Sequence, residues 1–231
     1  MIKHNIKHLA IILDGNGRWA KKNNKSRYIG YKNGAQNLHS LIPTIIENDI
    51  EYFTVFAFSS ENWQRPKREI ILLIKLLEQY LMPNTLEEFM SYSIRLKVIG
   101  NLEKFNTKIQ SQIKHFINST KNNKITLCIA LSYGSKEEII HACRTIANDL
   151  DSNSIKNLTE DNFKQYLYDP EMPDVDLLIR PGNVFRISNF LLWQSAYAEL
   201  YFSEKYWPDF NKEDLIKAIY EYTSRKRTFG K

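Results

Sequence analysis

The junction at residues 9–21 constrains the fold most, because a strongly apolar run meets a carboxylate, two glycines and a cation there. The run reads Leu-Ala-Ile-Ile-Leu-Asp-Gly-Asn-Gly-Arg-Trp-Ala-Lys. Consecutive apolar residues that include β-branched Ile11 and Ile12 are typical of a short strand buried on both faces. Gly15 and Gly17 allow a sharp turn that exposes backbone amides to an anion. The sequence therefore predicts a buried strand that ends in a phosphate-binding loop.

Asp14 is the informative residue of this loop. A carboxylate and phosphate oxygens repel each other at short range, so an acid here fits best if a divalent cation lies between them. Mg²⁺ characteristically binds one or two carboxylates together with substrate phosphates. Arg18 would neutralise part of the remaining charge. We therefore expect a magnesium-dependent diphosphate site.

Two alternatives compete with a diphosphate site. Asp-Gly-Asn-Gly is also typical of an ordinary turn. The spacing from Gly15 to Ala20 also fits a dinucleotide-binding loop, which requires a helix that begins at the loop. The following run, residues 21–27, is polar and aperiodic, so we expect no helix opening there. Because Asp14 would also face the pyrophosphate, we predict no binding of NAD or NADP.

Composition limits the class of protein. The chain has 231 residues, of which 43% are hydrophobic, enough for one large α/β domain over residues 1–231. Its net charge of +6 suits phosphates, nucleic acid or an anionic membrane. Two cysteines, Cys128 and Cys143, make a disulfide framework or zinc site unexpected. Without an apparent signal peptide or membrane-spanning run, we expect a reduced, cytoplasmic location.

Apolar runs alternate with helical patterns along the chain. Further strands are predicted at residues 52–58, 94–99, 125–131, 175–179 and 200–203. Helices are predicted up to residue 48, at 67–81, at 102–117, within 186–202 and at 212–225. This alternation predicts about six mainly parallel strands with helices on both sides. The helix at 70–81 is apolar around much of its circumference, which favours a buried helix or one wall of an apolar tunnel.

Polar residues follow the ends of several predicted strands. In open parallel sheets, ligands bind beyond the carboxyl ends of the strands, so these residues should line one site. Guanidinium groups offer paired donors that match a second phosphate. The expected neighbours are Asp14, Arg18, Ser59, Asn62, Arg65, Arg180, Arg186 and Ser188.

Three blocks, residues 8–20, 58–66 and 186–202, resemble the signature blocks of the cis-prenyltransferases, and among them the bacterial undecaprenyl diphosphate synthases. The resemblance extends from about His8 to Gly230. It implies a Mg²⁺-dependent homodimer with an apolar tunnel, which adds isopentenyl diphosphate to farnesyl diphosphate with cis double bonds. The implied product is undecaprenyl diphosphate, a lipid carrier precursor for cell-wall polysaccharide. We also expect peripheral contact with the inner face of the membrane and no nucleic-acid partner. The non-enzymatic alternative is a basic module that binds nucleic acid or serves as an accessory prenyltransferase subunit.

The resemblance also implies residue roles. Asp14 and Asn62 correspond to catalytic residues, and Asp14 and Glu199 to metal ligands. Arg180, Arg186 and Ser188 correspond to the isopentenyl diphosphate site. The remaining substrate-binding positions are Gly15, Asn16, Gly17, Arg18, Trp19, Arg27, Tyr31, Ser59, Ser60, Glu61, Trp63 and Arg65. The proton acceptor stays open between pyrophosphate and a water near Asp14 or Asn62.

The chain departs from the family pattern at a few positions. Tyr31 and Phe185 each replace a usual histidine, and Pro181-Gly-Asn183 replaces Thr-Gly-Gly. We therefore predict no metal ligation at residue 185. The tail Thr228-Phe-Gly230 stands where Arg-x-Gly is common. Ordinary structural roles also compete: the tryptophans could be core residues, Ser59 and Asn62 could cap a helix, and Glu199 could be a surface charge.

Overall fold

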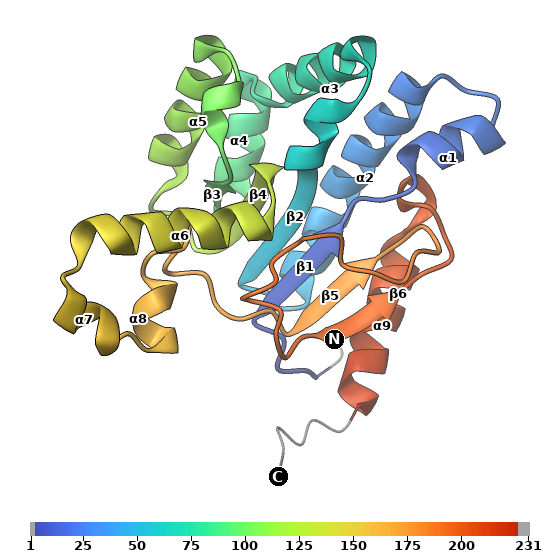
Figure 1. Ribbon diagram of the computed structural model, residues 1–231. Helices are drawn as coiled ribbons and strands as arrows, with labels where there is room; N and C mark the ends of the chain where they lie inside the picture. Colours follow the sequence, from blue (N-terminus) through green and yellow to red (C-terminus); the bar gives the residue numbers. More distant parts are fainter. Residues whose placement is uncertain (1–2, 226–231) are drawn as a thin grey trace.

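The computed structural model describes residues 3–225, except for the side chains of residues 152 and 153 (Figure 1). The strands are β1 (His8–Ile12), β2 (Tyr52–Ser59), β3 (Ile94–Ile99), β4 (Ile125–Tyr133), β5 (Leu177–Arg180) and β6 (Glu199–Phe202). The α-helices are α1 (Asn16–Lys22), α2 (Arg27–Glu47), α3 (Lys67–Tyr80), α4 (Pro83–Ser91), α5 (Thr107–Thr120), α6 (Ser135–Asp149), α7 (Ser152–Lys156), α8 (Glu160–Lys164) and α9 (Lys212–Ser224). Short 3₁₀ helices are η1 (Ser60–Gln64), η2 (Leu102–Lys104) and η3 (Trp207–Asp209).

The six strands form one sheet in the order β3-β4-β2-β1-β5-β6, and every neighbouring pair is parallel. The predicted six-stranded parallel sheet is therefore confirmed. Because β1 lies between β2 and β5, the loop after it is flanked by the carboxyl ends of both neighbours. This topology brings the ends of β2, β1 and β5 together at one edge of the sheet.

Strand β1 is buried along its whole length, as its apolar sequence predicts. Leu9 and Ile11 pack into the hydrophobic core on one face of the sheet. Ala10 and Ile12 pack into a second core on the opposite face. Since successive side chains of a strand point to opposite faces, burial on both faces favours the apolar run 9–12, and buried His8 is accommodated by hydrogen bonds to Thr54 and to the Pro173 carbonyl oxygen.

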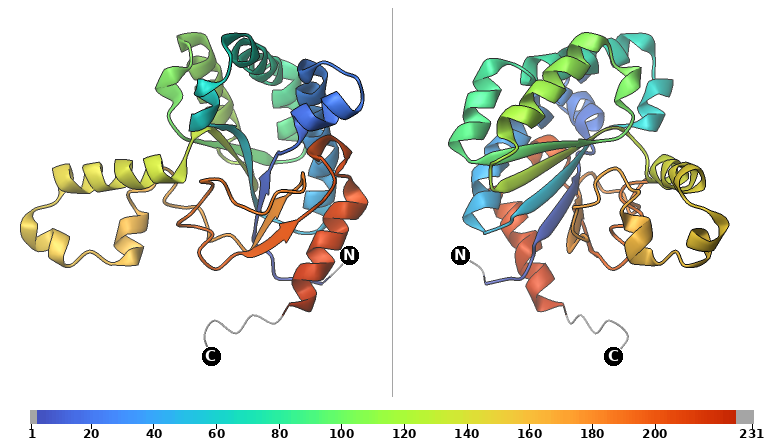
Figure 2. Two further views of the ribbon diagram at one scale, coloured as in Figure 1. Left: turned by 45° about the vertical axis from the view of Figure 1, so that its right-hand side comes forward. Right: turned by 90° about the vertical axis from the view of Figure 1, so that its left-hand side faces the viewer.

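The two faces of the sheet are covered differently (Figure 2). Helices α2, α4, α5 and α9 contribute side chains to the first core, with Ile45, Phe89, Ile113 and Ile219 as examples. The second core is completed by irregular segments around residues 172–175 and 187–191. Helix α6 joins this face through a hydrogen bond of 2.6 Å from the Tyr133 hydroxyl to Glu138. The expectation of helices on both sides therefore holds, but loops cover much of the second face.

The structure corrects the prediction for the first loop, because helix α1 begins at Asn16, directly after it. Gly15 turns the chain with a left-handed φ of 102°, whereas Gly17 lies inside the helix and provides no turn. A Cβ atom at Gly30 would lie 2.2 Å from the Asn16 carbonyl oxygen. A seven-residue helix of this composition is stabilised mainly by such tertiary packing, which local sequence does not reveal.

One further prediction is wrong, and one of the two alternatives for the helix at 70–81 is excluded. The helical stretch within residues 186–202 is a series of turns, in which Ser188, Asn189 and Leu191 have positive φ values of 51°, 62° and 46°. Left-handed residues cannot continue a right-handed helix. Helix α3 is not a buried helix, since Ile71 is 52% exposed and only Glu69 and Leu76 are buried. Within residues 3–225, we find no helix with both the length and the apolar character needed to cross a membrane.

Candidate active site

A cavity of about 660 Å³ opens at the carboxyl ends of the central strands. Its polar end is lined by Asp14, Asn16, Tyr31, Ser59, Glu61, Asn62, Arg65, Arg180, Ser188 and Asn189. Its remaining walls are mostly apolar and include Leu38 and Ile42 of α2, Leu73 and Leu77 of α3, and Phe89 of α4. The apolar side chains of α3 thus line a cavity. This agrees with the second of the two roles that its sequence favoured, one wall of an apolar tunnel. The arrangement suits a ligand with a charged head and a long hydrocarbon chain.

Asp14 lies at the polar end of the cavity, two residues beyond β1. Its carboxylate is paired with Arg180 Nη2 at 2.8 Å and with Arg18 Nη2 at 3.1 Å. Burial alone would raise the pKa of Asp14, but Arg180 and then Arg18 outweigh burial and keep the pKa below its usual value. Asp14 is therefore an ionised carboxylate in a cationic surrounding, as the sequence predicted.

Arg180 is the most enclosed cation of the site, with 5% of the residue exposed. Its Nη1 donates to Ser188 Oγ at 2.6 Å and to the carbonyl oxygen of Arg186. The left-handed conformation of Ser188 belongs to the turn that brings this hydroxyl to the guanidinium. Strained conformations of this kind are often found in binding sites. Arg180 and Ser188 are therefore held together by the backbone.

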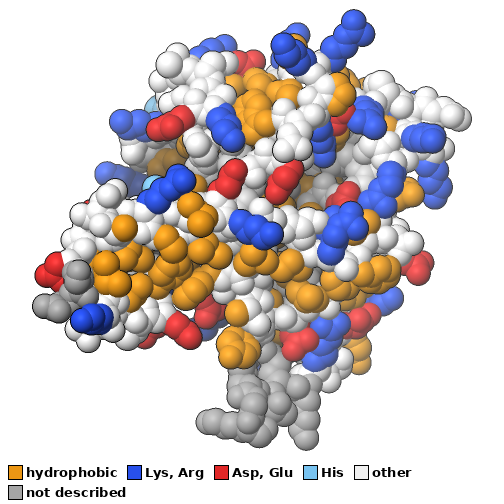
Figure 3. All heavy atoms as spheres, viewed as in Figure 1, with side chains coloured by type: hydrophobic (Ala, Val, Ile, Leu, Met, Phe, Trp, Pro, Cys, Tyr) orange, Lys and Arg blue, Asp and Glu red, His pale blue; other side chains and the backbone are white. Residues whose placement is uncertain are grey.

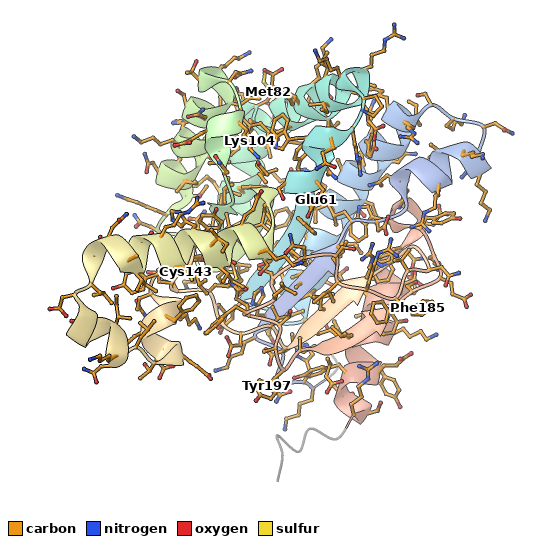
Figure 4. The ribbon with its side chains drawn as sticks, viewed as in Figure 1. Glu61, Met82, Lys104, Cys143, Phe185 and Tyr197 are labelled. Atoms are coloured by element: carbon orange, nitrogen blue, oxygen red, sulfur yellow. The ribbon has the colours of Figure 1, made fainter. Side chains whose placement is uncertain are left out.

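The segment after β2 supplies Ser59, Glu61 and Asn62 to the cavity. The Asn62 side-chain oxygen accepts a hydrogen bond of 3.2 Å from the Ser59 backbone amide, as a capping residue does. Glu61, just beyond the end of β2 in Figure 4, accepts a bond of 3.1 Å from Asn189. Trp63 donates to Ser132 Oγ at 2.9 Å and packs against Phe58. Asn62 thus caps the short helix η1 and also lines the cavity. Trp63 is half-buried and does not line the cavity.

A second cluster of charged residues lies at the α2 and α3 side of the cavity. The Glu69 carboxylate accepts hydrogen bonds from Arg65 at 3.0 Å, from Tyr31 at 2.6 Å and from Arg27. Sequence reasoning identified Arg27, Tyr31 and Arg65 but missed Glu69. The signal was present, because Glu69 follows Arg65 by four residues, the spacing of a helical ion pair. Asn189, directly after Ser188, was also missed.

Several predicted site residues lie outside the cavity wall. Gly15 caps α1, Ser60 lies beside Gly134, and the exposed Arg186 contributes its carbonyl oxygen to Arg180. The Trp19 indole donates to Asp209 at 2.6 Å. Trp19 and Trp193 are half-buried, which argues against a simple core role.

Glu199 is not brought to Asp14 within the chain. It pairs in register with Leu177 at the start of β6, and Leu177 pairs with Leu9. Glu199 therefore lies at the level of Leu9, three residues or ~10 Å before the end of β1 at ~3.3 Å per strand residue, and β5 separates its strand from β1. Its carboxylate accepts a bond of 2.9 Å from Arg225. A metal ion shared by Asp14 and Glu199 of one chain is inconsistent with this placement. The tail at residues 228–230 lies outside the described residues.

The donor set at Asp14 can be compared with the needs of Mg²⁺. No group of three or more His, Cys, Asp or Glu side chains within residues 3–225 could form a closed metal cage. One accessible carboxylate beside several anion-binding donors is instead the arrangement in which Mg²⁺ takes its other ligands from substrate phosphates and water. Asp14 therefore fits a metal ion that is shared with a bound diphosphate.

Comparison with known proteins identifies the family. Residues 12–230 match the prenyltransferase family described as "Putative undecaprenyl diphosphate synthase". The chain belongs to this family. An isoprenyl transferase of Rickettsia felis is 55% identical over 231 residues, which cover 100% of this chain and 96% of that protein.

Two crystal structures are similar to the whole chain. A probable undecaprenyl diphosphate synthase from Campylobacter jejuni is 38% identical with a TM-score of 0.82, covering 99% of this chain and 100% of that one. Lavandulyl diphosphate synthase from Lavandula x intermedia, in complex with dimethylallyl diphosphate, is 32% identical with a TM-score of 0.93, covering 98% of each chain. These similarities confirm the predicted cis-prenyltransferase fold, and the chain is an isoprenyl transferase of the undecaprenyl diphosphate synthase family.

Proposed function

We propose that this isoprenyl transferase extends farnesyl diphosphate by repeated addition of isopentenyl diphosphate, with Mg²⁺, to form undecaprenyl diphosphate. The observation that carries the proposal is a cavity that combines apolar walls from α2 and α3 with a charged end, where Asp14 pairs with Arg18 and Arg180. A diphosphate would bind at the charged end, and the hydrocarbon chain would lie along the apolar walls. The product would serve as a lipid carrier precursor for cell-wall polysaccharide.

The diphosphates of the allylic substrate and of isopentenyl diphosphate require different interactions in this reaction. The allylic diphosphate departs, so donors near it stabilise charge that grows in the transition state. The isopentenyl diphosphate stays bound, so donors near it mainly orient the alkene toward the allylic carbon. We assign Arg18, Arg27 and the amides at the start of α1 to the first group. Arg180, Arg186 and Ser188 are assigned to the second group.

Mg²⁺ would be held by Asp14 and by oxygens of the allylic diphosphate. When bound, it neutralises negative charge on the leaving group. Arg180 and Arg18 keep Asp14 ionised, which a metal-binding carboxylate requires. The apolar walls exclude water from the reacting carbons.

Incubation of the purified protein with farnesyl and isopentenyl diphosphates tests the proposal. We expect Mg²⁺-dependent release of pyrophosphate and a long prenyl product, separated by chromatography against standards of known length. Activity should disappear with EDTA and return with excess Mg²⁺. A product of a few isoprene units would contradict the undecaprenyl assignment, and full activity in EDTA would contradict the metal assignment.

A homodimer is proposed from the surface around β6, an open edge of the sheet. Phe185 and Tyr197 are 74% and 75% exposed near this edge, and Leu200 is exposed on the strand. Figure 3 shows hydrophobic side chains gathered in a band across this face, over α6 and the β5–β6 region. Large exposed apolar patches of this kind are typical of protein interfaces.

Analytical ultracentrifugation tests the homodimer directly. We expect the mass of two chains, and the Phe185→Asp and Tyr197→Asp variants should sediment as monomers at low micromolar concentration. Met90→Asp is a matched control, because Met90 is an exposed apolar residue on α4, away from β6. Dimers of unchanged stability in the first two variants would exclude this face as the interface.

We further propose a cytoplasmic enzyme that meets the inner face of the membrane through its lipid product. The protein should then fractionate as a soluble protein in the absence of substrate. It should associate with lipid vesicles only after turnover has produced a long prenyl chain. Recovery only in detergent extracts before turnover would contradict this proposal.

A further inference from the structure

Glu69 links three segments at the α2 and α3 side of the cavity. Its side chain is 9% exposed and lies in the first turn of α3. One carboxylate oxygen accepts from Tyr31 Oη at 2.6 Å and from Arg65 Nη1 at 3.0 Å. The other accepts from Arg27 Nη1. Because Arg27 and Tyr31 belong to α2, this carboxylate connects the walls that α2 and α3 provide.

The Tyr31 hydroxyl has two roles in this cluster. It donates to Glu69 and also accepts a hydrogen bond of 2.9 Å from Arg65 Nη1. Burial, together with the bond to Glu69, raises the pKa of Tyr31 to about 12. Burial alone would raise the pKa of Glu69, but Tyr31 and the two arginines together keep it below its usual value. A neutral phenol and an ionised carboxylate therefore persist together at neutral pH.

Only some residues of this cluster line the cavity. Tyr31 and Arg65 line the cavity, whereas Glu69 does not, so the carboxylate lies behind them. Among the hydrogen bonds formed within residues 3–225, Arg65 uses Nη1 for both Tyr31 and Glu69. Its Nη2 and Nε atoms are left for a ligand. A guanidinium fixed at one nitrogen loses less side-chain freedom when the others bind an anion.

We propose that Tyr31 and Glu69 are positioning residues that fix Arg65 for contact with the departing diphosphate of the allylic substrate. The proposal rests on the substrates proposed above. Tyr31 and Glu69 both hold Nη1, and because Arg65 lines the cavity, the other guanidinium nitrogens can serve a bound diphosphate. A donor held in advance stabilises the charge of a leaving diphosphate more than one that must be ordered during the reaction.

A cycle of variants tests the coupling between Tyr31 and Arg65. Tyr31→Phe retains the aromatic ring and removes only the hydroxyl. We expect it to lower kcat by about fivefold to twentyfold in the wild-type background, with little change in KM for isopentenyl diphosphate. In an Arg65→Ala background the same change should lower kcat by less than about twofold, because the group that Tyr31 positions is absent.

Tyr92→Phe is the matched control, since Tyr92 lies at the end of α4 and does not line the cavity. It should leave kcat unchanged. Equal thermal unfolding midpoints for wild type and Tyr31→Phe would exclude a general loss of structure. The proposal is overturned if Tyr31→Phe has no effect, or if it lowers kcat by the same factor with and without Arg65.

A second measurement separates failure of the proposed function from failure of the positioning proposal. If wild type fails to turn over farnesyl and isopentenyl diphosphates, the proposed function fails, and binding of inorganic pyrophosphate is measured by calorimetry instead. The positioning proposal then predicts about fivefold to twentyfold weaker binding by Tyr31→Phe. Equal affinities would overturn it independently of the function.

Discussion

The cavity has two clusters in which one carboxylate joins two arginines, and their exposure is reversed. In the first cluster the side chain of Asp14 is 28% exposed, while the side chain of its partner Arg180 is 6% exposed. In the second the carboxylate of Glu69 is 9% exposed, while Arg65 and Arg27 are 37% and 66% exposed. The buried group is thus a cation in the first cluster, where Asp14 and the 43% exposed side chain of Arg18 are both accessible. In the second cluster the buried group is the anion, and both cations are accessible.

This difference in burial indicates which kind of ligand each cluster can bind. An accessible carboxylate can bind a metal ion without leaving the protein surface, whereas accessible guanidinium groups can bind an anion. The buried member of each cluster is held by a neighbouring hydroxyl, that of Ser188 for Arg180 and that of Tyr31 for Glu69. The first cluster can therefore present a carboxylate to a metal ion beside a cation, Arg18, whereas the second presents only cations.

The largest expected effect is the loss of the accessible carboxylate in the first cluster. Asp14→Ala should lower kcat by at least ~10³, roughly 4 kcal/mol, because the metal at the leaving group acts mainly as charge develops. KM for isopentenyl diphosphate should change little. Steady-state kinetics at saturating Mg²⁺ provide the measurement. Near-normal kcat would remove Asp14 from the centre of the site.

Loss of the buried cation in the same cluster should act differently. Arg180→Ala should raise KM for isopentenyl diphosphate by about tenfold to a hundredfold, since one charged hydrogen-bonded contact contributes ~1.5–3 kcal/mol in ground and transition states alike. Arg180→Lys is the comparison variant, because it keeps the charge but not the paired donors. A fall in kcat without a rise in KM would place Arg180 with the leaving group instead.

These two clusters also mark how far the sequence predicts the site. Asp14, Arg180 and Ser188 follow or lie near strand ends, and the rule that ligands bind there brought them together correctly. The spacing of Glu69 from Arg65 was a local signal, but the contacts of Glu69 with Arg27 and Tyr31 depend on the approach of α2 to α3, which no local pattern encodes. Helix α1 was missed for a similar reason, because close packing at Gly30 stabilises it. Strand β1 was predictable because burial on both faces leaves a continuous apolar run.

The second cluster should contribute more visibly to stability than its exposed neighbours do. Glu69→Ala should reduce the free energy of unfolding by about 1–2 kcal/mol, because a buried acceptor of three bonds is lost while the exposed arginines regain water. Glu87→Ala, an exposed glutamate of α4, should stay within about 0.5 kcal/mol of wild type. Urea unfolding followed by circular dichroism measures both. Equal values for the two variants would mean that the Glu69 contacts add nothing to stability.

The smallest expected effect is a change in the acid dependence of stability. The pKa of Glu69 lies below its ordinary value of 4.5 in the folded chain, so its ionised form contributes stability above that pH. This contribution should decline as the pH falls from 4.5 toward the lower folded pKa, since the unfolded chain binds the proton first. Glu69→Gln cannot titrate, so its unfolding free energy should fall less steeply than that of wild type over this range. Urea midpoints measured in half-unit pH steps between pH 3 and pH 6 compare the two slopes, and identical slopes would show that the buried carboxylate gains no net stabilisation from Tyr31, Arg65 and Arg27.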